Sequence, residues 1–402
     1  MRLAYLTMQM PVPSETFLVV EVRHLAKVAE MQIFCLRKPH PRHQEMVWEE
    51  NVSELPIHFF PYFFSVRLWK DVGYWLRANP VVFWHMLWLL TQLCWKKPKI
   101  WLLSMAVLPK SFSIARRVES SKIDIVHAAW GHYPAVTLVL LKKLLPDVHI
   151  TLALGAYDRL IRHPMTALAA NHAAYILTQN PASAELIKNE WPQLAARVIP
   201  VMRGIETEKT DRLRTVEKIR GLIVSSGRLV PEKGHQVVIE AFKRIHAVSP
   251  HSRLLILGEG PYQAALEAQI HRLGLHDSVV LAGHLSQKAA FEQMAAAEVF
   301  VLATEAAYEN LPNVLKEAMG LGLPVVTTPT LGIETLIENE VTGYIVPRGD
   351  VEAIKNAVLR LLQDQALRDF MGQNSVAQIH ERFSVEQTTR QRLALYQQLL
   401  ED

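Results

Sequence analysis

A loop, a helix and a strand are predicted by one stretch, Glu309-Asn310-Leu311-Pro312-Asn313-Val314-Leu315-Lys316-Glu317-Ala318-Met319-Gly320-Leu321-Gly322-Leu323-Pro324-Val325-Val326-Thr327-Thr328. Pro312 suits the first residue of a helix, and the glycines before Pro324 suit its end. The apolar β-branched residues that follow favour a buried strand. Glu309 therefore belongs to the loop and Glu317 to the helix. Such a loop can present backbone N–H groups, together with the dipole of the helix, to an anion.

Strand-like apolar runs alternate with helical patterns on both sides of this stretch. They lie at 3–7, 32–36, 123–127, 149–154, 175–177 and 198–201, and again at 222–226, 253–257, 279–281, 299–302, 325–327 and 344–346. This alternation predicts an α/β fold with parallel sheets that are covered by helices on both faces. A chain of 402 residues is too long for one ordinary core. We therefore expect two doubly wound domains, with ligands beyond the carboxyl ends of the strands and in the cleft between the domains.

The expected domain boundary follows Arg203-Gly204-Ile205-Glu206, where the strand pattern restarts. The polar residues 206–214 suit a linker. We expect an N-terminal Rossmann-like domain at 1–205 and a second domain at 206–384. A last helix, at 385–402, is expected to cross back onto the first domain.

The composition excludes several classes of protein. Half of the residues are apolar and 20% are charged, which indicates a folded chain with a large core. The net charge of +4 gives no reason to expect a nucleic-acid partner. Two cysteines, Cys35 and Cys94, suggest neither a disulfide framework nor a cysteine metal cluster. No stretch suits a signal peptide or a membrane span, so we expect a cytoplasmic protein.

The segment 48–108 departs from the strand and helix alternation. It holds seven of the nine tryptophans and interleaves basic residues with them. One interpretation is an inserted helical pair, at about 60–108, that packs its aromatic side chains inward. The other is a surface that enters anionic lipid headgroups, which would place the protein at the inner face of the cytoplasmic membrane. The tryptophans are Trp48, Trp69, Trp75, Trp84, Trp88, Trp95 and Trp101.

Three glycine-containing loops follow strands of the second domain. In the first, Ser226-Gly227-Arg228-Leu229-Val230-Pro231-Glu232-Lys233-Gly234, Arg228 can span phosphate oxygens and Lys233 adds a point charge. Gly227 and Gly234 would permit a tight turn and a close approach of the backbone. The alternative is a solvated basic loop that caps a helix. Gly258 and the pair Gly283-His284 end the next two strands in the same way, although each of these is a weak motif alone.

Together these motifs resemble the family 4 glycosyltransferases, retaining enzymes of the GT-B fold. The spacing of Glu309 and Glu317 matches the family's Glu-x7-Glu element, and Gly227-Arg228-Leu229 with Lys233-Gly234 matches its Gly-Arg-Leu-x-x-x-Lys-Gly loop. The resemblance covers nearly the whole chain and is densest at 227–347. In the N-terminal half, Pro13-Ser14-Glu15-Thr16-Phe17 is similar to a subgroup that builds exopolysaccharides and related surface glycans.

The resemblance implies a donor site in the second domain. Arg228 and Lys233 would bind the donor diphosphate and stabilise the leaving group. Glu309 would contact the sugar near its reacting carbon, and Glu317 would hold the ribose hydroxyls. Asn310 stands where the family often has glycine, so the backbone amides there should still face the phosphates, but less freely. The implied donor site comprises Gly227, Arg228, Lys233, Gly258, Gly283, His284, Glu309, Asn310, Leu311, Pro312 and Glu317.

The resemblance implies an acceptor side in the first domain, where the sequence departs from the family. The family's histidine after the fourth or fifth strand is absent, because leucine stands at Leu154 in Leu152-Ala153-Leu154-Gly155-Ala156-Tyr157-Asp158. His132 could supply a catalytic imidazole instead. Ser14 or Thr16 would cap a helix whose start faces the cleft, although capping alone also explains them. The acceptor-side candidates are Ser14, Glu15, Thr16, His127 and Asp158.

The expected activity is retaining transfer of a hexose from a UDP- or GDP-sugar to a hydroxyl of a glycan or lipid-linked acceptor. Basic side chains and a helix N-terminus would stabilise the leaving diphosphate, so no cofactor and no metal are expected. Three alternatives are a catalytically degraded protein that only binds nucleotide-sugar, another enzyme on the same scaffold, such as an epimerase or a phosphorylase, and a membrane-associated adaptor.

Overall fold

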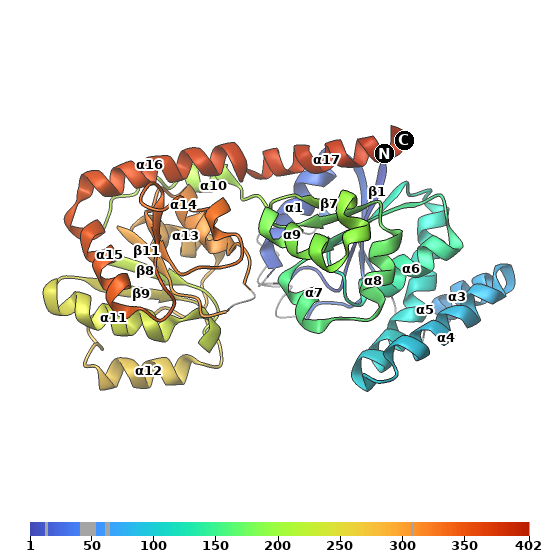
Figure 1. Ribbon diagram of the computed structural model, residues 1–402, viewed down its shortest axis with the longest axis horizontal. Helices are drawn as coiled ribbons and strands as arrows, with labels where there is room; N and C mark the ends of the chain where they lie inside the picture. Colours follow the sequence, from blue (N-terminus) through green and yellow to red (C-terminus); the bar gives the residue numbers. More distant parts are fainter. Residues whose placement is uncertain (13–14, 41–53, 61–64, 307–308, 402) are drawn as a thin grey trace. The chain divides into compact units, whose positions relative to one another are not determined.

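The computed structural model describes the chain except residues 13–14, 41–53, 61–64, 307–308 and 402. The chain divides into two compact units: unit 1 contains Met1–Arg203 and Thr388–Asp402, and unit 2 contains Gly204–Gln387. Each unit holds one parallel sheet with helices packed around it (Figure 1).

The sheet of unit 1 has the strand order β3-β2-β1-β4-β5-β6-β7. All neighbouring strands in it are parallel. Its strands are β1 (Arg2–Thr7), β2 (Glu30–Cys35), β3 (Ile57–Phe59), β4 (Ile125–Ala128), β5 (His149–Leu154), β6 (Tyr175–Thr178) and β7 (Val198–Pro200). The sequence pattern missed β3, which has three residues of intermediate exposure and therefore lacks a distinct apolar run.

The sheet of unit 2 has the strand order β10-β9-β8-β11-β12-β13, again with parallel neighbours. Its strands are β8 (Leu222–Ser226), β9 (Arg253–Leu257), β10 (Val279–Leu281), β11 (Val299–Leu302), β12 (Val325–Thr327) and β13 (Gly343–Ile345). In both sheets the strand order reverses beside the first strand. The point where it reverses is where doubly wound sheets bind ligands.

The helices connect successive strands and cover the apolar sheet faces. In unit 1 they are α1 (Thr16–Ala26), α3 (Val66–Ala78), α4 (Pro80–Cys94), α5 (Pro98–Ser120), α6 (Pro134–Leu144), α7 (Ala156–Ile161), α8 (Met165–His172) and α9 (Pro181–Glu190). In unit 2 they are α10 (Thr207–Asp211), α11 (His235–Val248), α12 (Gln263–Arg272), α13 (Gln287–Ala295), α14 (Asn313–Gly320), α15 (Val351–Gln363) and α16 (Gln365–Arg382).

Two buried clusters show how these helices are held. In unit 1, Leu6 and Val126 of the sheet pack with Leu140 of α6 in one apolar cluster. In unit 2, Leu254 and Val301 of the sheet pack with Phe242 of α11. Burial of each such side chain stabilises the folded state by about 1.5–3 kcal/mol.

The last helix, α17 (Val385–Glu401), contributes buried side chains to unit 1. Arg392 donates a hydrogen bond of 3.0 Å to Glu21 of α1, and Tyr396 is fully buried. At its start, the Ile205 N–H donates to the carbonyl of Phe383, and the Val385 N–H donates to the carbonyl of Ile205.

The segment 206–214 is not the simple linker that its polarity suggests. It contains α10, whose Thr207 and Thr210 are buried. The Thr210 hydroxyl donates to the carbonyl of Thr207. The Thr210 side chain thus satisfies one backbone carbonyl within the helix, which hydropathy alone does not reveal.

The tryptophan-rich segment forms three helices, α3, α4 and the first half of α5, which contact one another beside the sheet of unit 1 (Figure 1). The interpretation in which its aromatic side chains pack inward fails for four of its six described tryptophans. Trp75 is 3% exposed, whereas the side chains of Trp69, Trp84, Trp88 and Trp95 are 49–63% exposed. Trp48 lies outside the described residues.

Candidate active site

Backbone groups from three loops meet at the carboxyl edge of the unit 2 sheet. The Gly258 N–H donates to the carbonyl of Gly283 over 2.9 Å, and the Gly227 N–H donates to the carbonyl of Leu257 over 3.0 Å. A Cβ atom at Gly258 would lie 2.0 Å from the carbonyl oxygen of Gly227, closer than any real contact. The three weak glycine motifs therefore form one tightly packed backbone surface.

Gly234 is the residue of the first loop whose lack of a side chain matters most. Its φ angle is +70°, and a Cβ atom there would lie 1.7 Å from the carbonyl oxygen of Ala303. Gly227, by contrast, has ordinary space around it, since the nearest atom to a Cβ there would be 3.5 Å away. The expected close approach is thus made at Gly234 and Gly258 and not at Gly227.

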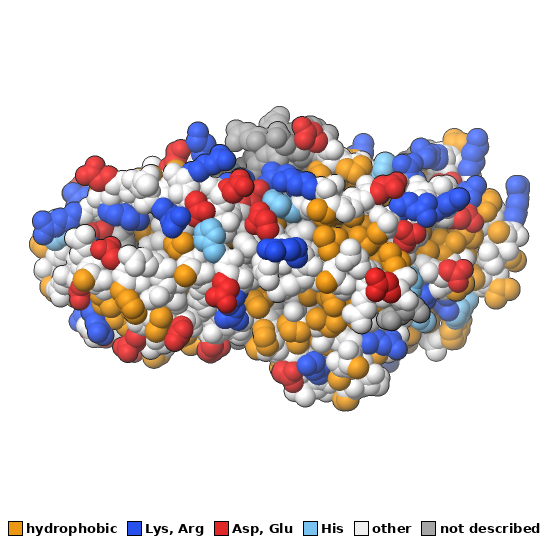
Figure 2. All heavy atoms as spheres, turned by 90° about the horizontal axis from the view of Figure 1, so that it is seen from above, with side chains coloured by type: hydrophobic (Ala, Val, Ile, Leu, Met, Phe, Trp, Pro, Cys, Tyr) orange, Lys and Arg blue, Asp and Glu red, His pale blue; other side chains and the backbone are white. Residues whose placement is uncertain are grey.

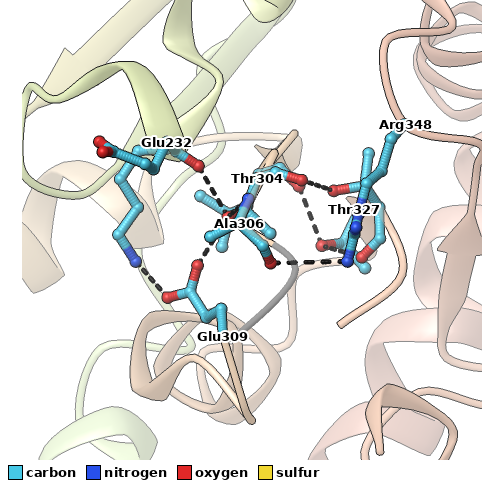
Figure 3. Close-up of polar contacts among 9 residues, drawn as sticks. Glu232, Thr304, Ala306, Glu309, Thr327 and Arg348 are labelled. Atoms are coloured by element: carbon cyan, nitrogen blue, oxygen red, sulfur yellow. Dashed lines mark hydrogen bonds and ion pairs between the residues drawn. The ribbon is translucent and has the colours of Figure 1, made fainter. Parts of the chain in front are cut away.

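Lys233 and Glu309 form an ion pair between this loop and the loop before α14. The Lys233 ammonium contacts Glu309 Oε1, and the Thr304 hydroxyl lies 2.6 Å from Glu309 Oε2 and 2.9 Å from the carbonyl of Glu232 (Figure 3). Thr304 is fully buried, whereas the side chains of Lys233 and Glu309 are 19% and 18% exposed. The Glu309 carboxylate therefore contacts a buried hydroxyl, that of Thr304, through one oxygen and a partly exposed cation, Lys233, through the other.

The loop that carries Glu309 is anchored at both ends. The Leu331 N–H donates to the carbonyl of Glu309 over 3.0 Å, and Arg348 donates to the carbonyls of Ala306 and Pro329 (Figure 3). Asn310 is 7% exposed. The described non-glycine residues with positive φ are Lys122, Arg162 and Glu340, so asparagine fits at position 310 without backbone strain.

The helix after this loop begins one residue later than the sequence indicates. Pro312 has an extended backbone and stands at the N-cap, and α14 starts at Asn313. Leu311 and Pro312 are buried. Glu317 lies on α14 with a partly exposed side chain, as expected from its spacing to Glu309.

Two of the predicted donor-site residues, Arg228 and His284, have exposed side chains. Each follows a glycine at the carboxyl edge of the sheet. Of the predicted donor-site side chains, Lys233 and Glu309 contact each other directly. Arg228 and His284 lie on neighbouring loops, and Glu317 lies on α14.

Sequence reasoning missed His235, which immediately follows the glycine loop. The imidazole is fully buried, its Nδ1 lies 3.2 Å from the Ser225 hydroxyl, and a Cβ at Gly227 would lie 3.6 Å from its Nε2. Burial lowers the pKa of His235 from 6.5 to about 4. It is thus a neutral support for the loop. Thr304 was missed as well, because a buried threonine at a strand end has no distinctive pattern.

In unit 1, Asp158 joins two strand ends. Its carboxylate accepts the Gly131 N–H over 2.8 Å and the Gly155 N–H over 2.9 Å, and it lies 3.3 Å from His132 Nδ1. The side chains of His132 and Asp158 are 9% and 2% exposed. Asp158 thus joins the backbone at Gly131 and Gly155 and lies beside His132, and nothing in this geometry requires it to contact an acceptor. Leu154 packs against Gly131, where a Cβ would lie 2.3 Å from its Cδ2 atom.

His127 does not suit the acceptor-side role that its position suggested. It is fully buried, its Nδ1 lies 2.9 Å from the Thr151 hydroxyl, and its Nε2 lies 3.4 Å from Arg392. Burial and the nearby Arg392 charge lower its pKa well below the ordinary range. We therefore correct this assignment: His127 belongs to the polar network that fixes α17.

The start of α1 also differs from expectation. Glu15 occupies the N-cap position without a capping hydrogen bond from its side chain, and Thr16 is the first helical residue, so Thr16 is not the cap. Ser14 lies outside the described residues. Burial raises the pKa of Glu15, an effect that the charges of Arg203 and His132 oppose. Arg203 lies 3.8 Å from the ring centre of Phe17 and 5.2 Å from that of Trp130.

Comparison with known proteins identifies the family. Residues 208–378, which contain the three glycine loops and the Lys233–Glu309 pair, match the family model described as glycosyl transferases group 1. Residues 208–378 thus form a domain of the group 1 glycosyl transferases. The predicted enzyme class is thereby confirmed.

Relatives of this glycosyl transferase include proteins named for polysaccharide synthesis. It is 28% identical to the amylovoran biosynthesis glycosyltransferase AmsK of Erwinia amylovora, over 91% of this chain and 92% of AmsK. It is 31% identical to the capsular polysaccharide biosynthesis glycosyltransferase CapM of Staphylococcus aureus, over 50% of this chain and 54% of CapM.

Solved structures show the same fold. HepE of Anabaena, in complex with UDP, superposes with a TM-score of 0.72 at 17% identity, over 99% of this chain and 100% of HepE. A sucrose-phosphate synthase from Thermosynechococcus elongatus gives a TM-score of 0.72 at 16% identity, over 100% of this chain and 99% of that protein. The predicted GT-B fold class is confirmed. No helix in the described ranges of this glycosyl transferase is both long and apolar enough to cross a bilayer.

Proposed function

We propose that this enzyme transfers a hexosyl group from a nucleoside diphosphate sugar to a hydroxyl of a growing polysaccharide, with retention at the anomeric carbon. In this reaction the bond between the anomeric carbon and the diphosphate oxygen breaks. A bond from the same face of that carbon to the acceptor oxygen forms, and the acceptor proton passes to the leaving phosphate. The free nucleoside diphosphate and the extended glycan are the products.

The contact between Lys233 and Glu309 is the observation that carries this proposal. A diphosphate bound at the glycine loops would offer the ammonium a stronger anionic partner than one carboxylate. Because both side chains are partly exposed, this exchange of partners needs no unfolding of the loop. Lys233 would then stabilise the charge that develops on the leaving group, with Arg228 adding a second cation.

Glu309, released from Lys233, would accept hydrogen bonds from the hydroxyls of the sugar. Thr304 keeps the carboxylate in place, since its hydroxyl lies 2.6 Å from Glu309 Oε2. Glu317 on α14 would hold the ribose hydroxyls, and the backbone of the Gly258 and Gly283 loops would contact the base. These roles rest on the family resemblance and on the shared edge of the sheet.

We propose UDP-hexose as the first donor to test. HepE, which has the same fold, was crystallised with UDP and with UDP-glucose. AmsK and CapM are named for the synthesis of amylovoran and capsular polysaccharide, which supports a glycan or lipid-linked acceptor. In unit 1, His132 is the candidate for contact with that acceptor, because it follows a strand end and lies 3.3 Å from the Asp158 carboxylate.

A nucleotide-release assay with a panel of UDP- and GDP-sugars tests the proposal. We expect release of one nucleoside diphosphate by the native enzyme and loss of about 10²- to 10³-fold in turnover for Lys233→Met and for Glu309→Gln. A matched pair on the exposed surface of unit 2, Lys355→Met and Glu352→Gln, should leave turnover unchanged.

Each outcome of this assay has a clear meaning. Selective thermal stabilisation by a nucleotide-sugar without any turnover would indicate a binding protein in place of a transferase. Unchanged turnover in both site variants would contradict the proposed site. Because the positive charge comes from side chains, we also expect activity to persist in a chelator.

A further inference from the structure

Helix α4 exposes large apolar side chains on the face opposite its buried one, beside the polar residues Thr91 and Gln92. It has no charged side chain among residues 80–94. Met86, Leu90 and Cys94 on one face are fully buried, whereas Val81, Trp84 and Trp88 on the other are 77%, 63% and 57% exposed. A helix at the surface of a protein normally carries polar residues on its outer face. A contiguous group of exposed apolar side chains typically marks a site of interaction with another protein or with a membrane.

Neighbouring residues and helices carry further exposed apolar side chains. Trp95, just after α4, is 61% exposed, and Trp69 of α3 is 49% exposed. Leu102 and Leu103, in the first half of α5, are 65% and 50% exposed. The three helices contact one another, so these exposed residues all come from one layer of packed helices at the edge of unit 1 (Figure 1). We call this layer, residues 65–103, the helical layer.

The charge of the helical layer is strongly positive. It contains six basic residues and one acidic residue, Asp71, which accepts a hydrogen bond of 2.7 Å from Ser113. The Lys96 ammonium lies 5.7 Å from the ring centre of Trp95. In Figure 2, basic side chains border apolar ones at the right of the view, where α3–α5 lie. The basic residues are Arg67, Lys70, Arg77, Lys96, Lys97 and Lys99.

We propose that the helical layer binds the surface of an anionic lipid bilayer, with α4 lying in the plane of the headgroups. Tryptophan prefers this interfacial depth, and each lysine or arginine near an anionic surface adds attraction. At about 1.5 Å per residue, the 15 residues of α4 extend about 22 Å, less than the roughly 30 Å of a hydrocarbon core. The helix therefore suits insertion along the surface and not across it.

The same observations oppose a second copy of this chain as the occupant. A symmetric contact between two helical layers would bring two strongly positive faces together, and such like-charge contacts are unfavourable. An anionic membrane would accommodate the exposed apolar side chains of α4 and attract the basic residues of the helical layer. This inference does not depend on the donor site in unit 2, because the lipid surface is bound without any sugar nucleotide.

Co-flotation of the full chain with vesicles tests this inference. We expect binding to vesicles that contain about one third phosphatidylglycerol, weak binding to pure phosphatidylcholine, and release as salt is raised. Trp84→Gln with Trp88→Gln should lower the partition coefficient by about tenfold or more, because both indoles lose their apolar contact. Lys96→Gln with Lys99→Gln should lower it by about 10- to 30-fold on anionic vesicles only.

Matched controls come from unit 2. Phe370 is an exposed aromatic residue outside the layer, and Lys243 and Lys288 are exposed lysines. Phe370→Gln and the pair Lys243→Gln with Lys288→Gln should bind vesicles as the native chain does. Nucleotide release from the donor should be unchanged in all four variants.

Three results would overturn the inference. They are no difference between the layer variants and the controls, equal binding to both kinds of vesicle, and a dimer in light scattering that the tryptophan variants abolish. A blue shift of tryptophan emission on addition of anionic vesicles, lost in the tryptophan variant, would support it. Since donor turnover is measured separately, failure here and failure of the proposed transferase activity are distinguishable.

Discussion

The two units use polar residues at their strand ends in different ways. In unit 2, Lys233 and Glu309 are partly exposed and paired with each other. In unit 1, Asp158 is almost completely buried and holds the backbone N–H groups of Gly131 and Gly155. A partly exposed ion pair can exchange its partners for a ligand, whereas a buried carboxylate that accepts backbone hydrogen bonds cannot do so without exposing unpaired groups. Under the proposed function, similar positions in the fold would serve chemistry in one unit and architecture in the other.

The largest expected effect is on turnover. Replacing Lys233 with alanine should lower turnover by about 10²- to 10³-fold, because the charge that develops on the leaving diphosphate loses its cation. Melting temperature should change little, since the side chain is partly exposed and its ion pair contributes about 1 kcal/mol or less. Nucleotide release and thermal unfolding, measured on the same sample, check this. A large loss of stability would show that Lys233 is architectural like Asp158.

The pH dependence of stability should reveal His235. Its pKa is about 4 in the folded protein and about 6.5 when unfolded. Below pH 6.5 the unfolded chain binds a proton that the native site resists, so the free energy of unfolding should fall until about pH 4 and then level off. His235→Gln should reduce the difference in unfolding free energy between pH 7 and pH 4.5 by roughly 2–3 kcal/mol.

Chemical denaturation at the two pH values measures this difference, and any general cost of the substitution cancels in it. His276, whose side chain is 68% exposed, provides the control. His276→Gln should leave the pH dependence unchanged. An identical pH dependence in native protein and His235→Gln would contradict the neutral, buried role of this imidazole.

The architectural role in unit 1 predicts a loss of stability at Asp158. Asp158→Ala removes the acceptor of two backbone N–H groups and should lower the free energy of unfolding by about 2–3 kcal/mol. Donor hydrolysis in the absence of acceptor should persist in the fraction that remains folded. Denaturant unfolding with Asp277→Ala, at an exposed carboxylate, as the control measures the effect. Equal stability of the two variants would remove the contrast between the units.

The smallest effect is expected at Thr304. Thr304→Val keeps the volume but removes the hydroxyl that lies 2.6 Å from Glu309. The carboxylate would be held less firmly, and turnover should fall by about tenfold, or roughly 1.4 kcal/mol. Thr304→Ser should retain turnover. A serine variant as slow as the valine variant would mean that packing, and not the hydroxyl, is what matters.

Much of the fold could be predicted because parallel strands are buried on both faces and read as apolar runs. β3 escaped detection because its three residues are only partly buried. The placement of Lys233 and Glu309 in one site was predicted from loop motifs that follow strands, whereas their direct ion pair was not. Thr304 and His235 were not, because their roles depend on burial and on contacts between loops that are distant in sequence.

In unit 1 the sequence was a poorer guide for a related reason. His127 and His132 both follow apolar runs, and no local pattern separates them. Their difference arises from α17, which is distant in sequence and brings Arg392 to within 3.4 Å of His127. The exposed tryptophans of the helical layer were equally ambiguous, because an aromatic stripe at helical spacing suits a core or a surface.

A double-mutant cycle on Lys233 and Glu309 tests the central claim most directly. Values of kcat/KM for nucleotide release would be measured for the native enzyme, Lys233→Met, Glu309→Gln and the double variant. If the two side chains act as one unit on the donor, the double variant should be no slower than the slower single variant. Losses that simply multiply, or no loss in either single variant, would contradict the account.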